Sequence, residues 1–215
     1  MTKNNNWVFI NVPYDKQYEA MYLALIAGLI TLGLIPRCTL EVPTNIIRLR
    51  RILSLLNKCH YSLHDLSRVE LCEGRERLPR FNMPFEAGLS FALSLNSSKH
   101  RCAILEAKKH RLLITLSDLN GYDPHIHDGT PEGILNALTN IYAKTKGYQP
   151  TVKDLKRVYA ELCRYSMVYK KENSTESLFS ARAFKDLVIA AKASSSQLKC
   201  GSQDLRLQHA SRFPS

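Results

Sequence analysis

The feature that most constrains the fold is a strongly apolar run from Met21 to Pro36. The run is too short to span a bilayer, which takes roughly 20 apolar residues in helical form. Pro36 and Arg37 close it. We therefore expect a buried helix over Tyr18–Leu32, followed by a buried strand over Leu34–Leu40.

The other apolar segments alternate between strand and helix patterns. Further strands are expected at Trp7–Val12, Tyr61–Leu66 and Cys102–Glu106, with a strand or a short helix at Leu112–Leu116. Further helices are expected to begin at Thr44, at about Pro84 and at Pro131. Strands that alternate with helices predict an α/β fold with an open, mostly parallel sheet covered on both faces.

The pattern changes after Pro150. Val152–Lys171 and Leu178–Ala193 have amphipathic helical patterns with no strand between them, and a Ser- and Gln-rich polar segment begins at Ser194. We therefore expect an α/β domain over residues 1–148, a C-terminal helical extension over 149–193 and a disordered tail over 194–215. The extension is expected to pack on the domain or to mediate contact with a second subunit or partner protein.

The net charge of +11 favours a polyanionic partner, either nucleic acid or the phosphates of a nucleotide. The basic residues are dispersed along the chain and do not alternate with aromatic residues, so nucleic acid is possible but not favoured. None of the six cysteines forms a CxxC pair, so the sequence does not indicate a zinc ribbon. The polar start of the chain lacks a signal-peptide pattern, so we expect a reduced, cytoplasmic protein without a membrane partner.

Polar residues follow the predicted strands where ligands bind in open α/β sheets, beyond the carboxyl ends of the strands. The candidate substrate-binding and catalytic residues at this edge are Asn11, Tyr14, Asp15, His64, Asp65, Ser67, Arg68, Asn82 and Glu86. The chain has no GxGxxG, GxxxxGK[ST] or GxSxG motif, which argues against a dehydrogenase, a kinase and an α/β-hydrolase. Carboxylates, amides, a tyrosine and arginines suit cleavage of a glycosidic bond.

Glu86 is an acid in the first turn of an otherwise apolar helix, FNMPFEAGLSFAL. It is either a favourable contact with the helix dipole or a group that does chemistry. Ser90 follows it four residues later, and the expected core face of the helix carries Phe85, Leu89 and Leu93. On this pattern Glu86 faces away from the core.

Three other positions keep two interpretations each. Asp65 caps the turn after its strand or takes part in the reaction, and His64 is either a structural or a catalytic histidine. The segment Ser117–Gly129 includes His125, His127 and Asp128, but their spacing matches no established metal motif. We expect no metal there, and an ordered loop or lid instead.

The stretches HDLS and FNMPFEAGLSFAL together resemble the nucleoside 2-deoxyribosyltransferase-like and TIR-like superfamily, in which a catalytic glutamate begins a helix. Glu86, Gly88 and Ala92 match the second half of that helix pattern. Over about residues 7–145 the chain also resembles a largely uncharacterised bacterial branch, which we expect to serve in defence or stress signalling. The resemblance implies a flavodoxin-like sheet and cleavage of an N-glycosidic bond.

By this resemblance Glu86 is the nucleophile or stabilises an oxocarbenium ion, Asp65 binds the ribose or base, and the loop with Tyr14 covers the substrate. The family has an acid shortly before the glutamate, whereas this chain has Arg80 and Asn82. The departure disfavours nucleoside base exchange, and the arginines suit a pyrophosphate. We expect NAD as substrate, hydrolysed at the nicotinamide–ribose bond, and no separate cofactor.

Two alternatives remain open. The same pocket suits a non-catalytic module that senses a nucleotide, and the C-terminal helices suit a scaffold that forms homo-oligomers.

Overall fold

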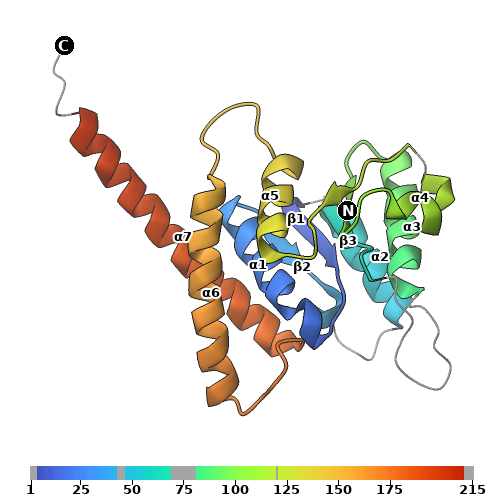
Figure 1. Ribbon diagram of the computed structural model, residues 1–215, viewed down its shortest axis with the longest axis horizontal. Helices are drawn as coiled ribbons and strands as arrows, with labels where there is room; N and C mark the ends of the chain where they lie inside the picture. Colours follow the sequence, from blue (N-terminus) through green and yellow to red (C-terminus); the bar gives the residue numbers. More distant parts are fainter. Residues whose placement is uncertain (1–3, 43–46, 69–80, 120, 211–215) are drawn as a thin grey trace.

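Figure 1 shows a computed structural model of the protein, in which helices cover both faces of a single sheet. The structure describes residues 4–42, 47–68, 81–119 and 121–210, with side chains described as far as Leu198. The strands are β1 (Asn4–Asn11), β2 (Ile35–Arg37), β3 (Cys59–Asp65), β4 (Arg101–Glu106) and β5 (His125–Ile126). The helices are α1 (Glu19–Thr31), α2 (Arg48–Lys58), α3 (Asn82–Leu95), α4 (Arg111–Thr115), α5 (Pro131–Ile141), α6 (Val152–Glu172) and α7 (Ala181–Ala210).

The five strands form one parallel sheet in the order β2-β1-β3-β4-β5. Leu63 lies at the middle of the sheet, in register with Ile10 of β1 and Ala103 of β4. The predicted α/β class with an open parallel sheet is confirmed. The strand order changes direction between β1 and β3, which is where open α/β sheets form a crevice for ligands.

Helices α1 and α5 lie on one face of the sheet, and α2 and α3 lie on the other. Helices α6 and α7 add a further layer by packing against α1, as Figure 1 shows. Every residue of α1 from Met21 to Thr31 is buried. A helix that is apolar on all sides requires this enclosure, because a two-layer arrangement would leave one side in water.

Gly28 permits the close approach of α5 and α6 to α1. A Cβ atom at this position would lie 2.5 Å from Leu138 Cδ1 and 3.2 Å from Leu135 Cδ2. Both leucines are buried in the main core and have little room to move. The absence of a side chain at Gly28 is therefore part of the interhelical packing.

Several boundaries differ from those expected. Strand β2 is shorter than Leu34–Leu40, and the 3-10 helix η2 (Thr39–Glu41) follows it. Pro36 has no N–H for the sheet, and the Arg37 guanidinium bonds Glu41 at 2.8 Å, which favours the turn. The segment at Leu112–Leu116 is helical, as α4, and the expected helix start at Thr44 lies outside the described residues.

The segment expected to be a loop or lid, Ser117–Gly129, contributes the edge strand β5 to the sheet. It also contains the 3-10 helix η3 (Ser117–Leu119). Its strand has only two residues, too few for an alternating pattern to mark it.

The two expected C-terminal helices are present as α6 and α7. The Thr151 hydroxyl and the Asp154 carboxylate form a reciprocal cap at the start of α6. Helix α7 does not end near Ala193 but continues to Ala210. The expectation of a disordered tail from Ser194 stays a prediction. None of the described helices has the length and apolar character needed to cross a membrane.

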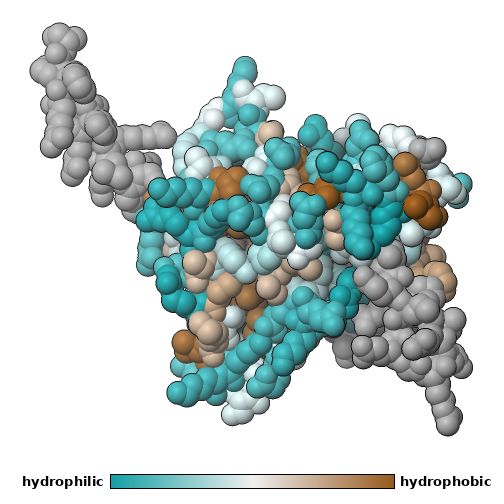
Figure 2. Space-filling model, in the orientation of Figure 1, coloured by the Kyte–Doolittle hydropathy of each residue, from teal (hydrophilic) through white to brown (hydrophobic). Residues whose placement is uncertain are grey.

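The molecular face in Figure 2 is mostly hydrophilic, with apolar side chains in separate groups. Exposed apolar side chains of the α3–α4 region include Phe81, Phe85 and Ile114. Isolated exposed apolar residues are normal on a protein surface.

Replacing Gly28 with leucine should lower the free energy of unfolding by about 1–3 kcal/mol, because the new side chain overpacks the contact with Leu138. Urea denaturation measures the change. Gly88→Ala is the matched control: Gly88 is exposed in α3 and a Cβ there meets nothing within 4 Å. The control should raise stability by about 0.5–1 kcal/mol through helix propensity. Equal stability of Gly28→Leu and the unmodified protein would contradict the packing argument.

Candidate functional site

The candidate site lies at the carboxyl edge of the sheet, where the strand order changes direction between β1 and β3. Asn11 is the last residue of β1 and pairs in register with His64 of β3. The Asn11 side-chain Nδ2 donates to His64 Nδ1 at 3.1 Å and to the backbone oxygen of Met83 at 3.2 Å. This amide therefore joins the ends of two central strands to the first turn of α3.

Helix α3 begins at Asn82, earlier than expected, so Glu86 lies just beyond its first turn and points inward. Its exposed fraction is 3%, whereas Phe85 is 58% exposed, and Ser90 shares the buried face with Glu86. The expected orientation, with Phe85, Leu89 and Leu93 toward the core, is therefore wrong for Phe85 and for Glu86. The sheet surface below α3 carries polar residues, and a buried polar group needs a polar partner. Ser90 meets that need by bonding the buried pair Ser62 and His100.

The Glu86 carboxylate is held by one arginine. Arg48 Nη2, from the start of α2, lies 3.0 Å from Glu86 Oε1. Burial raises the pKa of the Glu86 carboxyl, and the Arg48 guanidinium offsets part of that rise. The Arg48 side chain is 51% exposed, so this ion pair reaches from the interior to the surface. Arg48 can therefore leave Glu86 and bind an anion from solution without first having to move out of the protein interior.

Tyr14 follows the end of β1, at the same carboxyl edge of the sheet. Burial raises the pKa of its hydroxyl, and the Cys38 thiol and the Glu86 carboxylate raise it further. Its ring centroid is 5.5 Å from that of Phe179, in the connection between α6 and α7. Tyr14 thus stays a neutral hydroxyl near Glu86, and the C-terminal helices support it.

Asp65 forms a separate buried cluster. The Tyr18 hydroxyl donates to Asp65 Oδ2, and the Ser67 backbone N–H donates to Oδ1 at 2.8 Å. His127 Nε2 lies 3.3 Å from Oδ2. Burial alone would raise the pKa of Asp65, but the interactions with His127, Ser67 and Tyr18 outweigh it and lower the pKa below its usual value.

The position of His127 depends on its backbone neighbours. The Gly129 N–H donates to His127 Nδ1 at 3.1 Å, which places the ring proton on Nε2, facing Asp65. A Cβ on Gly133 would lie 1.9 Å from the His127 backbone oxygen, so only glycine fits this contact at the start of α5. His127 was considered as a metal ligand from the sequence, whereas in the structure it faces a carboxylate.

The two candidate catalytic carboxylates do not converge. His64 and Asp65 are consecutive in β3, so their side chains point to opposite faces of the sheet. His64 bonds Asn11, which also holds Met83 of α3. Asp65 instead bonds Tyr18, before α1 on the opposite face. The site on the Glu86 side thus brings together Asn11, His64, Glu86 and Arg48. Tyr14 packs against Tyr22 and Phe179 and reaches this group only through an electrostatic interaction with Glu86.

The remaining predicted residues lie around these two clusters. Asp15 Oδ1 accepts from the Tyr18 N–H at the start of η1 (Lys16–Tyr18), and its Oδ2 lies 3.2 Å from Arg68 Nη2. Ser67 is buried and supports Asp65, as described above. Asn82 is exposed as the first residue of α3.

A buried acid and arginine that sequence reasoning did not single out as a pair lie at the end of β4. Glu106 accepts a hydrogen bond from Arg111 Nη2, which also donates to the Ser67 backbone oxygen at 2.5 Å. The pair connects the loops that follow β3 and β4. A basic run after a strand, KKHR, was the only sequence signal for it.

The arrangement offers no evident cation site among the described residues, since no group of three or more His, Cys, Asp or Glu side chains is placed to hold a metal ion. His125 and His127, the two histidines considered for that role, have different surroundings: His127 faces Asp65, and His125 lines a cavity near Tyr61.

Comparisons of the chain with protein-family models, curated proteins and solved structures find no match. The family resemblance noted in the sequence therefore has only the α/β fold and its parallel sheet as support.

His64 should make stability depend on pH. Burial, with a further contribution from His100, lowers the pKa of His64 to about 3, against about 6.5 in an unfolded chain. The stability that comes from this neutral histidine is fully present above about pH 6.5. It is lost as the pH falls toward 3, because only the unfolded state then binds the proton. In His64→Phe, the slope of unfolding free energy against pH between about 4 and 6 should fall by about 1.4 kcal/mol per pH unit. Denaturant titrations at several pH values measure this slope. An unchanged slope in His64→Phe would refute the lowered pKa of His64.

Proposed function

We propose that this protein cleaves the N-glycosidic bond of a nucleotide, with NAD hydrolysed at its nicotinamide–ribose bond. The observation that carries the proposal is the buried Glu86 carboxylate, which faces inward beside the strand-order reversal and bonds a half-exposed arginine. The family resemblance at FNMPFEAGLSFAL supports the same role for Glu86. We extend the proposal to a bacterial defence or stress function on that resemblance alone.

Glu86 acts on the sugar carbon in this proposal. As the C–N bond to nicotinamide breaks, the ribose gains oxocarbenium character, which a nearby carboxylate stabilises or traps as an ester. Water then adds to the same carbon and loses a proton, so the products are nicotinamide and ADP-ribose. The Arg48 guanidinium favours the ionised form of Glu86 that this step needs.

Arg48 and Tyr14 have supporting roles. On substrate binding, the half-exposed Arg48 side chain exchanges its bond to Glu86 for one to a pyrophosphate oxygen, which frees the carboxylate as the anion arrives. Tyr14 donates its hydroxyl to the ribose. Asp65 has a positioning role, because its contacts hold η1, β3 and the loop before α5 together.

The choice of NAD over a deoxynucleoside follows from the leaving group. Nicotinamide leaves a positively charged pyridinium as a neutral molecule and requires no proton. A purine or pyrimidine leaves more readily when an acid protonates it. Of the other carboxylates at this edge, Asp65 points away from Glu86, and Glu41 is paired with Arg37. Glu86 alone is sufficient for NAD, whereas acid-assisted departure of a nucleoside base needs a second acid.

One observation favours a nucleotide-sensing module as a second candidate. Arg48 pairs with Glu86 while its own side chain is half exposed, as in a site that binds phosphate by exchange of ion pairs. Such a module binds NAD or a related nucleotide, seen as a thermal shift, and releases no product.

Glu86→Gln provides the first test. Concentrated protein is incubated with NAD and with a panel of deoxynucleosides, and products are separated by chromatography. The unmodified protein should release nicotinamide, and Glu86→Gln should be slower by about a hundredfold or more, because the amide cannot support the developing cation. Unfolding curves of both proteins establish that the variant is folded. Undiminished turnover in Glu86→Gln would refute the role of Glu86, whereas NAD binding without product would favour the sensing module.

Arg48→Ala should change the pH dependence of the same reaction. Loss of the guanidinium raises the pKa of Glu86 further, because burial is no longer offset. The acid limb of the kcat/KM profile, which reports the free protein, should therefore move to higher pH, and the KM for NAD should rise. Arg50→Ala is the control, since Arg50 is exposed on the same helix. An acid limb of kcat/KM that stays in place in Arg48→Ala would show that Arg48 does not lower the pKa of Glu86 in the free protein.

A further inference from the structure

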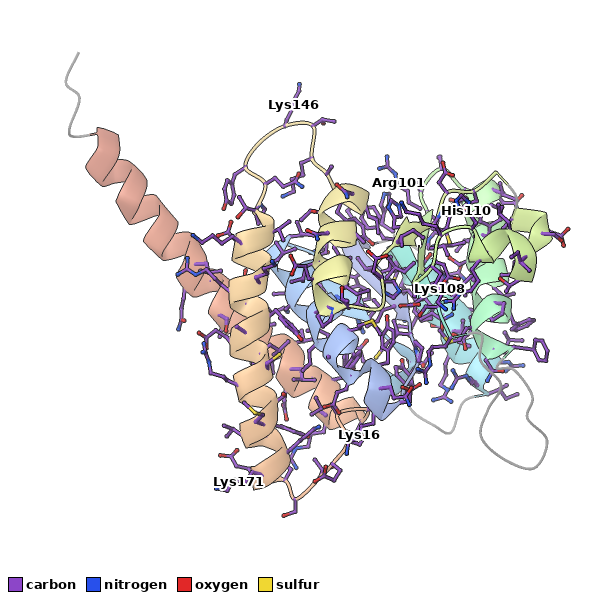
Figure 3. The ribbon with its side chains drawn as sticks, in the orientation of Figure 1. Lys16, Arg101, Lys108, His110, Lys146 and Lys171 are labelled. Carbon is purple, nitrogen blue, oxygen red and sulfur yellow. The ribbon has the colours of Figure 1, made fainter. Side chains whose placement is uncertain are left out.

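A cavity lies at the edge of the sheet opposite to Glu86. It has a volume of about 240 Å³ and is lined by Tyr61, Arg101, Cys102, Ala103, Tyr122, His125, Asn140, Ile141 and Tyr142. Arg101 is the first residue of β4 and His125 the first of β5, while Asn140–Tyr142 form the end of α5. Figure 3 shows Arg101 at the end of the sheet opposite to Lys16, which follows β1. The cavity is therefore separate from the candidate catalytic site.

Aromatic rings form much of the cavity wall. Tyr61 and Tyr142 meet edge to face, with ring centroids 5.3 Å apart. Tyr122 is held by its hydroxyl, which donates to the Cys102 backbone oxygen, and by an edge contact with Phe91 at 5.5 Å between centroids. These contacts fix the rings in position before any ligand arrives. Fixed aromatic walls favour a planar ring.

The Tyr142 hydroxyl is buried and has no hydrogen-bond partner among the described residues. Burial raises its pKa, and the neighbouring Tyr61, Cys102 and Tyr122 raise it further, so the hydroxyl lies among groups that line the cavity. A buried hydroxyl without a partner costs free energy. The hydroxyl has almost no accessible surface, so a polar ligand atom removes that cost when the Tyr142 ring turns its hydroxyl toward the cavity.

Arg101 provides a positive charge at the cavity mouth. It is exposed, and it forms no hydrogen bond or ion pair with the part of the chain that the structure describes. Its guanidinium is suited to a carboxylate, which it can bind through two parallel hydrogen bonds. The nearby His125 adds no charge at neutral pH, because burial lowers its pKa.

We propose that this cavity binds a small aromatic carboxylate, with the carboxylate on Arg101, the ring against Tyr61 and Tyr122, and a polar ring substituent on the Tyr142 hydroxyl. The volume excludes a dinucleotide, since pockets for drug-sized ligands hold roughly 300–1,000 Å³. The proposal is independent of the reaction assigned to Glu86, because the two sites share no side chain.

The test titrates the full chain with benzoate, 3-hydroxybenzoate, 4-hydroxybenzoate and neutral benzamide, followed by two-dimensional NMR. Saturable shifts of amide signals from residues 61, 101–103 and 140–142 are expected with the carboxylates. Benzamide should bind about tenfold more weakly or worse, because it lacks the charge that Arg101 recognises. Absence of saturable binding by all three carboxylates at millimolar concentration overturns the proposal, as does equal affinity for benzamide.

Two variants locate the interaction. Arg101→Ala should weaken binding of the carboxylates by about tenfold or more. Arg164→Ala is the control and should leave binding unchanged, since Arg164 is exposed on α6 and paired with Glu161. Tyr142→Phe removes only the unpartnered hydroxyl, so the variant should stay folded and lose the preference for a hydroxybenzoate over benzoate. Retained affinity in Arg101→Ala, or shifts confined to residues outside the cavity, overturns the proposal.

Discussion

Enclosure of helix α1 on every side is the constraint on which the rest of the structure depends. The helix carries buried side chains around its whole circumference, and each fully buried Leu or Ile contributes about 1.5–3 kcal/mol relative to exposure. The sheet covers one side only, so α5, α6 and α7 cover the others, and Gly28 lets them approach. The C-terminal helices predicted as an extension therefore complete the core of the predicted domain. Deleting residues 150–215 would uncover α1, so such a deletion cannot test assembly by itself.

The same enclosure connects the C-terminal helices to the candidate site. Tyr22 of α1 packs against Phe179, with ring centroids 5.0 Å apart, and Phe179 also meets Tyr14 beside Glu86. At the start of α1, Tyr18 bonds the buried carboxylate of Asp65. A shift of the α6–α7 connection would therefore move Tyr14, without any change in α3.

Sequence patterns were sufficient to locate β1, β3 and β4 and the capped helices α5 and α6, but they could not orient α3. That helix is apolar nearly all round, so its periodicity carried little information about direction. Polar sheet residues set its inward face: Ser62 bonds Ser90, and His64 bonds Asn11, which also holds the Met83 backbone. Glu86 pairs with Arg48, and Asp65 pairs with His127. Each pair joins segments far apart in the sequence, so no local pattern predicts it. Strand β5 was missed because two residues pair through backbone atoms alone.

Glu86 and Asp65 show how environment separates two acids at one sheet edge. Both are buried, yet the pKa of Glu86 is raised and that of Asp65 is lowered. Burial acts on both in the same direction, so the difference arises from partners: Asp65 has two hydrogen bonds and a histidine, and Glu86 has one solvent-reaching arginine. An acid whose two carboxylate oxygens are both bonded inside the protein, like Asp65, has a structural role. An acid whose counter-ion can leave for solution is the one that ligand binding can release. Within the proposed function, the order of events then matters: NAD must bring its pyrophosphate to Arg48 before Glu86 meets the ribose, because the ion pair otherwise neutralises the carboxylate.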